Sequence, residues 1–160
     1  MASASTAIYQ TYTLYAAAST NGIRQINHAA SGSFKCMLLS SGYVCAATHS
    51  VESQLLANEL SAGAANGYTV GGEDIPNITF TVAAGGTATF DGDNVIITAA
   101  GGDISARYIA VIHSAPFANA SALARPTMFL IDPGQVETAG DGTTFNINWS
   151  ADGIVQVKPG

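Results

Sequence analysis

The chain has 160 residues and a formal net charge of −6, with 48% hydrophobic and only 10% charged residues. This length suits one domain that buries its own core without a metal or a disulfide. Its five cationic residues are scattered, whereas a protein that grips phosphates needs clustered Lys and Arg. We therefore expect no direct contact with nucleic acid and no docking on an anionic membrane. The low charge indicates either that a partner covers much of the surface or that this surface is rich in Ser, Thr, Asn and Gly.

The first twenty residues differ from the rest of the chain. No Lys or Arg precedes Arg24, so the basic start of a secretory signal is missing, and synthesis in a reducing cytosol is expected. Nowhere do about 18 apolar residues follow one another, as a membrane-spanning helix requires. The segment Ala7–Tyr15 is rich in β-branched and aromatic residues and predicts a strand. We assign residues 1–20 to an N-terminal arm or edge strand, and residues 21–160 to a single β-sandwich domain.

Short apolar segments bounded by turn residues predict strands through most of the remaining chain. These segments are Phe34–Leu39, Ile75–Val82, Thr87–Phe90, Val95–Thr98, Ile104–Ile112, Thr127–Ile131, Thr143–Trp149 and Ile154–Val157. The turns Asp91–Asn94 and Ser150–Gly153 are each predicted to join the neighbouring strands in a hairpin. The segment Ser50–Leu60 predicts the one helix, with Ser50 as its N-cap.

About eight strands with frequent turn signals and one short helix predict an all-β fold, a jelly-roll-like β-sandwich. The predicted helix places Val51, Leu55, Leu56 and Leu60 on one face. Alternation along the strands predicts a buried core. Its expected members are Phe80, Ile109, Val111, Phe129, Phe145, Ile147 and Trp149.

No pattern of residues predicts catalysis. His28, His49 and His113 are far apart, and none has a second ligand at metal spacing, so we expect surface or hydrogen-bonded histidines. The segment Asp91–Asn94 begins like a calcium loop but lacks its later Gly and closing Glu, which favours a polar hairpin turn. We expect no enzyme activity, no cofactor and no metal. A hydrolase site assembled through space rests only on a generic supply of Ser and His.

Two cysteines, Cys36 and Cys45, flank a predicted turn. They form either a cross-strand disulfide or two reduced, buried thiols that act as small hydrophobes. Because nothing in the sequence argues for an oxidising compartment, the reduced form is favoured.

Arg107 is a charge inside the apolar segment Ile104–Ile112 and should have a partner, with Asp74, Asp103 and Asp132 as candidates. An ion pair at the edge of the core is favoured over a contact between subunits.

Several motifs, in their order along the chain, resemble a known family. They are Leu38-Leu-Ser-Ser-Gly-Tyr43, Asn58-Glu-Leu-Ser61, Gly67-Tyr-Thr-Val-Gly-Gly72, Ile104-Ser-Ala-Arg-Tyr-Ile-Ala-Val-Ile112 and Phe145-Asn-Ile-Asn-Trp-Ser-Ala-Asp-Gly-Ile-Val155. Over residues 34–157 the chain resembles a widespread family of small tailed-bacteriophage virion structural proteins. The resemblance implies a β-sandwich or jelly roll, a role in capsid decoration (cement) or in head–tail or fibre attachment, and no catalytic residues.

On this resemblance we expect a capsid decoration protein that is made in the host cytoplasm and stabilises the assembled shell on the virion surface. Its expected partners are the major capsid protein and copies of itself, with a trimer favoured because capsids offer symmetry axes and the chain carries little charge. The alternative is a tail or collar fibre, or a receptor (carbohydrate)-binding β-sandwich module. The candidate residues for contact with a capsid or subunit are Ile8, Tyr9, Tyr12 and Arg107.

Overall fold

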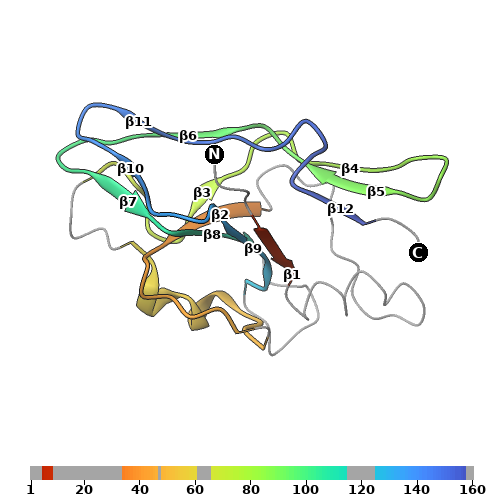
Figure 1. Cartoon of the computed structure of the whole chain (residues 1–160), viewed down its shortest axis with the longest axis horizontal. Helices are drawn as coiled ribbons and strands as arrows, with labels where there is room; N and C mark the ends of the chain where they lie inside the picture. The colour runs from red at the N-terminus through yellow and green to blue at the C-terminus, as the bar shows by residue number, and fades with distance from the viewer. Residues whose placement is uncertain (1–4, 9–33, 47, 61–65, 115–124, 158–160) are drawn as a thin grey trace.

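The computed structural model describes residues 5–8, 34–46, 48–60, 66–114 and 125–157, and most of the regular elements in these ranges are antiparallel strands. Figure 1 shows two layers, one above the other. The lower layer is a five-stranded sheet in the order β1-β9-β8-β2-β3. Its strands are β1 (Ser5–Ile8), β2 (Phe34–Leu39), β3 (Glu73–Asp74), β8 (Tyr108–His113) and β9 (Thr127–Asp132).

Two smaller sheets form the upper layer, and a separate two-stranded sheet lies at one end of the molecule (Figure 1). The three-stranded sheet, in the order β12-β5-β4, contains β4 (Thr79–Val82), β5 (Ala88–Asp91) and β12 (Val155–Val157). The remaining pairs are β6 (Val95–Thr98) with β11 (Thr144–Ile147), and β7 (Ile104–Ala106) with β10 (Glu137–Ala139). The predicted all-β, sandwich-like fold is confirmed.

Both predicted hairpins are wrong. The turn Asp91–Asn94 does not fold β5 back onto β6, because β5 pairs with β4 and β12 while β6 pairs with β11. Likewise Ser150–Gly153 is a tight turn, in which the Gly153 N–H donates to the Ser150 carbonyl, but the strands beside it do not pair with each other. The pairs β6–β11 and β5–β12 instead follow one another as two stretches of one interrupted ribbon.

The segment Ile104–Ile112 is not the single strand that the sequence predicts. It breaks at Arg107, where the backbone N–H donates to the Leu39 carbonyl at 2.9 Å. On one side of this residue β7 pairs with β10, and on the other side β8 pairs with β2 and β9. Arg107 therefore marks the point where the chain passes from one sheet to another.

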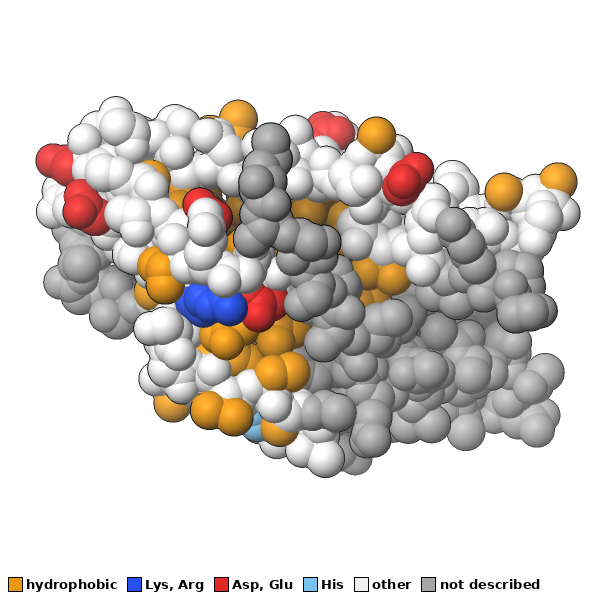
Figure 2. Space-filling view, in the orientation of Figure 1, with side chains coloured by type: hydrophobic (Ala, Val, Ile, Leu, Met, Phe, Trp, Pro, Cys, Tyr) orange, Lys and Arg blue, Asp and Glu red, His pale blue; other side chains and the backbone are white. Residues whose placement is uncertain are grey.

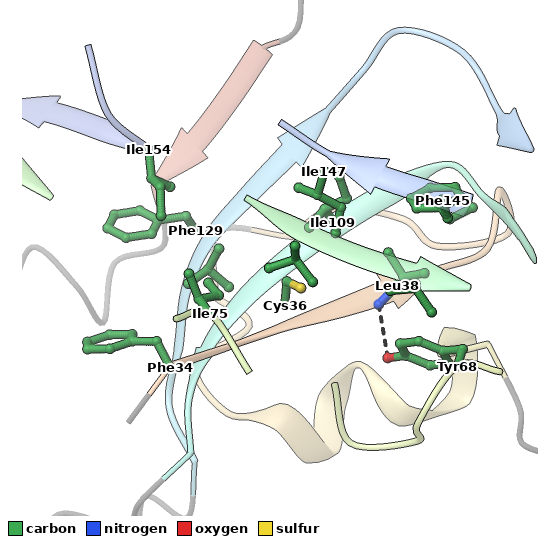
Figure 3. Close-up of a cluster of buried hydrophobic side chains, with 14 of the residues drawn as sticks. Phe34, Cys36, Leu38, Tyr68, Ile75, Ile109, Phe129, Phe145, Ile147 and Ile154 are labelled. Atoms are coloured by element: carbon green, nitrogen blue, oxygen red, sulfur yellow. Dashed lines mark hydrogen bonds between the residues drawn. The ribbon is translucent and has the colours of Figure 1, made fainter. Parts of the chain in front are cut away.

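The core has two parts, one on each face of the five-stranded sheet. Figure 3 shows the larger part, where Leu38 and Ile109 of the lower layer and Phe145 and Ile147 of the upper layer all point into the space between layers. Met37 and Leu39, which alternate with Leu38 along β2, point to the opposite face of the sheet and belong to the second cluster. This explains why every residue of Phe34–Leu39 except Lys35 is apolar, since both faces of this strand are covered.

The second cluster is covered by the segment that was predicted to be a helix. That prediction is wrong in kind, because the structure has two short 3₁₀ turns there, η1 (Glu52–Gln54) and η2 (Leu56–Asn58). Ser50 is not the N-cap; its backbone N–H instead donates to the Gln54 side chain at 2.7 Å. Of the predicted apolar face, Leu55 is fully buried whereas Leu56 is 48% exposed.

Most of the predicted core residues are buried, with two exceptions. Phe80 is 41% exposed, and Trp149 is half-buried. Both lie in the upper layer, Phe80 on the outermost strand and Trp149 just beyond β11. The alternation correctly predicted which way their strands face, but not how far the opposite layer extends beneath them.

Candidate functional site

Arg107 is held by Asp132, one of its three predicted partners. Its Nη1 forms an ion pair with Asp132 Oδ1, and its Nη2 donates to Asp132 Oδ2 at 3.1 Å. The guanidinium also lies 4.9 Å from the ring centre of Tyr108. The favoured interpretation, an ion pair at the core edge, is therefore confirmed, and this cation is already neutralised within the chain.

The other candidate contact residues lie at the N-terminal end. Ile8 is the last residue of β1, the edge strand that pairs with β9, and stands opposite Phe129. Tyr9 and Tyr12 lie outside the described residues, as does most of the predicted strand Ala7–Tyr15. Asp132, the partner of Arg107, stands opposite Ser5 at the other end of the β1–β9 ladder, so the structure does not bring Ile8 and Arg107 together.

The potentially reactive side chains are used in packing. The hydroxyl of Tyr43 and Nδ1 of His49 are hydrogen-bonded at 2.7 Å, and His113 is buried with its ring against Phe34. Both cysteines are free; Cys36 is buried, but Cys45 is exposed, contrary to the expectation of two buried thiols. Burial raises the pKa of Cys36 to about 12. Within the described part of the chain, no group of three His, Cys, Asp or Glu residues could hold a metal, and His28 lies outside it.

A polar network beside β2 has a structural role. The Tyr68 hydroxyl accepts the Leu38 N–H at 3.1 Å (Figure 3) and donates to Glu59 at 2.8 Å. Nearby, Arg125 forms an ion pair with the buried carboxylate of Glu52 at 2.5 Å. Burial is the main cause of the raised pKa of Glu52, while Arg125 acts to lower it. These contacts attach the segment after β2 to the sheet.

The β4–β5 hairpin (residues 79–91) projects from one end of the upper layer (Figure 1). All four residues of β4 are exposed, and among them Val82 is 65% and Phe80 41% exposed. No charged residue occurs from Ile75 through Phe90. Among the described strands β4 pairs only with β5, so it is the outermost strand of its sheet. Natural edge strands are usually protected by a charge, a proline or a bulge, and β4 itself has none of these.

The backbone of β4 presents two residues to the outer side of this sheet. The Ala83 N–H donates to the Thr87 carbonyl at 2.9 Å. Because backbone groups alternate in direction along an antiparallel strand, Thr81 then faces β5, and Phe80 and Val82 face outward. The sequence signal for this surface is the uncharged run from Ile75 through Phe90, of which the sequence analysis predicts only Phe80 to be core.

A cavity of about 400 Å³ opens between β10 and β11. Its floor is apolar and includes Ile109 and Ile131, whereas its rim carries polar side chains such as Asn146 and Glu137. The described residues that line it are Ile109, Ile131, Pro133, Glu137, Thr138, Ala139, Thr144, Phe145, Asn146, Ile147, Asn148 and Trp149. Sequence analysis did not find this cavity, because Ile109 in its floor comes from β8, which is distant along the chain from β11.

Charge is sparse on the molecular surface. Figure 2 shows Lys or Arg side-chain atoms at a single place on this face, with acidic side-chain atoms beside them, while other acidic side chains are scattered. No helix in the described ranges is long and apolar enough to cross a membrane.

No family model, no curated protein and no solved structure matches the chain. The residues and their geometry are therefore the basis for assigning a function.

Proposed function

We propose that this chain is a bacteriophage virion structural protein that decorates the assembled capsid shell and associates with copies of itself through the β4–β5 hairpin. The order of motifs that resembles small virion proteins supports the phage assignment. The single observation that supports association is the projecting hairpin, which has no charge from Ile75 through Phe90 and leaves Val82 65% exposed.

The hairpin has the properties of a surface that is covered in the working protein. Exposed Phe80 and Val82 lose contact with water when a neighbour packs on them, and apolar area of this kind contributes about 25 cal/mol per Å². The outward backbone groups of Val82 supply hydrogen bonds to a neighbouring strand. A closed homo-oligomer, with a trimer favoured, then binds the repeated sites of a shell with several modest contacts at once.

The major capsid protein is the proposed partner, and the capsid surface is the proposed location. Arg107 contributes little to this contact in the proposal, because Asp132 neutralises its charge internally. The uncharged hairpin leaves apolar packing and strand pairing as the forces of assembly. Binding should therefore depend only weakly on salt, unlike the binding of a charged surface.

The test compares charge placed on the hairpin with charge placed elsewhere. Phe80→Lys and Val82→Lys put a cation on the hairpin, and Ile96→Lys, at a side chain that is 64% exposed on β6, is the matched control. We expect light scattering to show a wild-type oligomer and a smaller species for the hairpin variants, with similar melting temperatures. The control should remain oligomeric.

Sedimentation with capsids that lack the protein tests the second half. Wild type and Ile96→Lys should sediment with the shells, the hairpin variants should not, and a particle reconstruction should place the chain on the outer surface. A monomeric wild-type protein at micromolar concentration, or no binding to shells, contradicts the proposal.

A further inference from the structure

The cavity between β10 and β11 lies where the upper layer lacks a strand. These two strands follow one another and share the turn of residues 140–143, but they diverge from it to pair with different partners (Figure 1). β10 pairs with β7, and β11 pairs with β6, so in the described sheets neither pairs with the other. The lower layer has five strands, whereas the β6–β11 sheet above it has two. A sheet edge and an uncovered floor therefore meet at the cavity.

The free edge of β11 presents backbone hydrogen-bonding groups to this space. The Ala99 N–H donates to the Thr143 carbonyl at 2.8 Å. Alternation along the ladder then turns the backbone of Phe145 toward β6, and that of Thr144 and Asn146 toward the cavity. The Thr144 carbonyl has a contact of 3.4 Å with the Asn146 side-chain amide, which is long for a hydrogen bond. A neighbouring strand would satisfy these groups better.

The floor of the cavity is apolar and suits an apolar side chain of a bound segment. Ile109 and Ile131 stand directly opposite each other in the β8–β9 ladder; Ile109 is buried, but Ile131 is only half-buried. Phe145 and Ile147 close the space from β11. Such a floor suits a branched aliphatic side chain better than a sugar, whose hydroxyls would lose their hydrogen bonds to water there.

The volume fits a short piece of strand. In a sandwich, one strand residue takes up about 3.3 Å along the chain, 4.8 Å across the sheet and 10 Å between layers, or about 160 Å³. The cavity volume of about 400 Å³ therefore corresponds to about two to three residues. Glu137 is the one charged side chain among the described lining residues, so the cavity accepts an uncharged segment or one with a single cation.

We propose that this cavity is a strand-acceptor site, in which an extended, uncharged or singly basic segment of a partner protein pairs with the free edge of β11 and places an apolar side chain over Ile109 and Ile131. The partner segment completes the upper layer by one strand. This site is separate from the β4–β5 hairpin and does not depend on the assembly proposed for that hairpin.

Trp149 makes occupancy measurable, because it lines the cavity and is the only tryptophan in the chain. Its ring is held by a hydrogen bond from Nε1 to the Asp93 carbonyl at 2.8 Å. The probe is a pool of capped heptapeptides, Thr-Xaa-Thr-Xaa-Thr-Xaa-Lys, in which Xaa is Val, Ile, Leu or Phe. We expect members of the pool to shift Trp149 emission in a saturable way. The same peptides with proline at the central Xaa should have no effect, because proline cannot donate to a strand ladder.

Two variants separate the cavity from the rest of the surface. Ala139→Phe adds a ring inside the cavity and should weaken peptide binding about tenfold or more. Ile96→Phe adds the same ring to an exposed position on β6 and should leave binding within about twofold. If Ala139→Phe fails to fold, nuclear Overhauser contacts between bound peptide and the amides of Thr144 and Asn146 in the wild-type protein replace it.

The outcomes are decisive in both directions. Saturable binding with contacts to the Thr144 and Asn146 amides supports the acceptor site. The proposal is overturned if no peptide in the pool binds at millimolar concentration, if binding is insensitive to Ala139→Phe, or if only sugars such as glucose, galactose and N-acetylglucosamine shift Trp149 emission.

Discussion

Phe80 and Phe90 stand directly opposite each other in the β4–β5 ladder, yet Phe90 is 1% exposed and Phe80 is 41% exposed. Opposite residues of an antiparallel pair point to the same face, so both rings face the interior side of the upper layer. Phe90 meets Phe34 and Phe129 of the lower sheet, with ring centres 4.8 Å and 5.6 Å away. The upper layer thus extends past the lower one, and Phe80 lies on the extension.

The two phenylalanines should differ sharply when truncated. Phe90→Ala removes a ring from a closed site and should lower the free energy of unfolding by about 3–5 kcal/mol. Phe80→Ala should cost about 1 kcal/mol or less in the isolated subunit, because much of that ring is in water. Denaturant unfolding of the two variants under conditions where the protein is monomeric measures both values. Equal losses would mean that Phe80 is covered within the subunit.

The two thiols should react very differently. Cys36 is buried and has a pKa near 12, so it holds almost no thiolate at pH 8, whereas Cys45 is exposed. A disulfide reagent should therefore modify one thiol in the folded protein and two after unfolding in denaturant. Cys45→Ser should abolish the reaction of the folded form. Rapid modification of both thiols in native buffer would contradict the burial of Cys36.

The contribution of Glu52 to the free energy of unfolding should decrease as the pH rises from about 4.5 through the raised pKa of this side chain. Its pKa is raised above the ordinary value of 4.5, so in this range the folded state binds the proton more tightly than the unfolded state. The stabilisation is therefore complete below about pH 4.5 and is lost as the pH rises through the raised pKa. The difference in unfolding free energy between wild type and Glu52→Gln should decrease across this window in urea titrations. Glu137→Gln, at an exposed side chain, serves as the control, and a difference that grows with pH would contradict the assignment.

Two glycines of similar backbone conformation should respond unequally to alanine. Gly67 and Gly142 have φ values of +84° and +78°, which residues with a side chain rarely adopt. A Cβ at Gly142 meets nothing within 4 Å, so Gly142→Ala should cost about 1 kcal/mol from the backbone alone. A Cβ at Gly67 would overlap the carbonyl oxygen of Thr98, which belongs to the β6 backbone and cannot rotate away. Gly67→Ala should therefore destabilise the fold clearly more than Gly142→Ala in thermal unfolding, and similar losses would argue against this close approach.

The local sequence pattern was sufficient to predict the bounds of the strands that lie over the centre of the core. The predicted bounds of Phe34–Leu39 agree with β2, and Thr127–Ile131 falls one residue short of β9. These segments consist mostly of apolar residues, and most of their residues are buried in the structure, so local preference and tertiary environment agree. The ion pair between Arg107 and Asp132 was predictable for a related reason, since a cation within an apolar segment requires a carboxylate nearby.

The sequence by itself determined the fold class, the position of most strands and the direction in which their side chains point, because these follow from a period of two residues and from turn chemistry. Only the tertiary structure decided which strands pair. Asp91–Asn94 and Ser150–Gly153 satisfy their turn hydrogen bonds whichever strand follows, so their residues carry no information about the partner. The exposed edge of β4 and the cavity beside β11 exist because the two layers differ in extent. That difference depends on contacts between residues far apart along the chain, which no local pattern encodes.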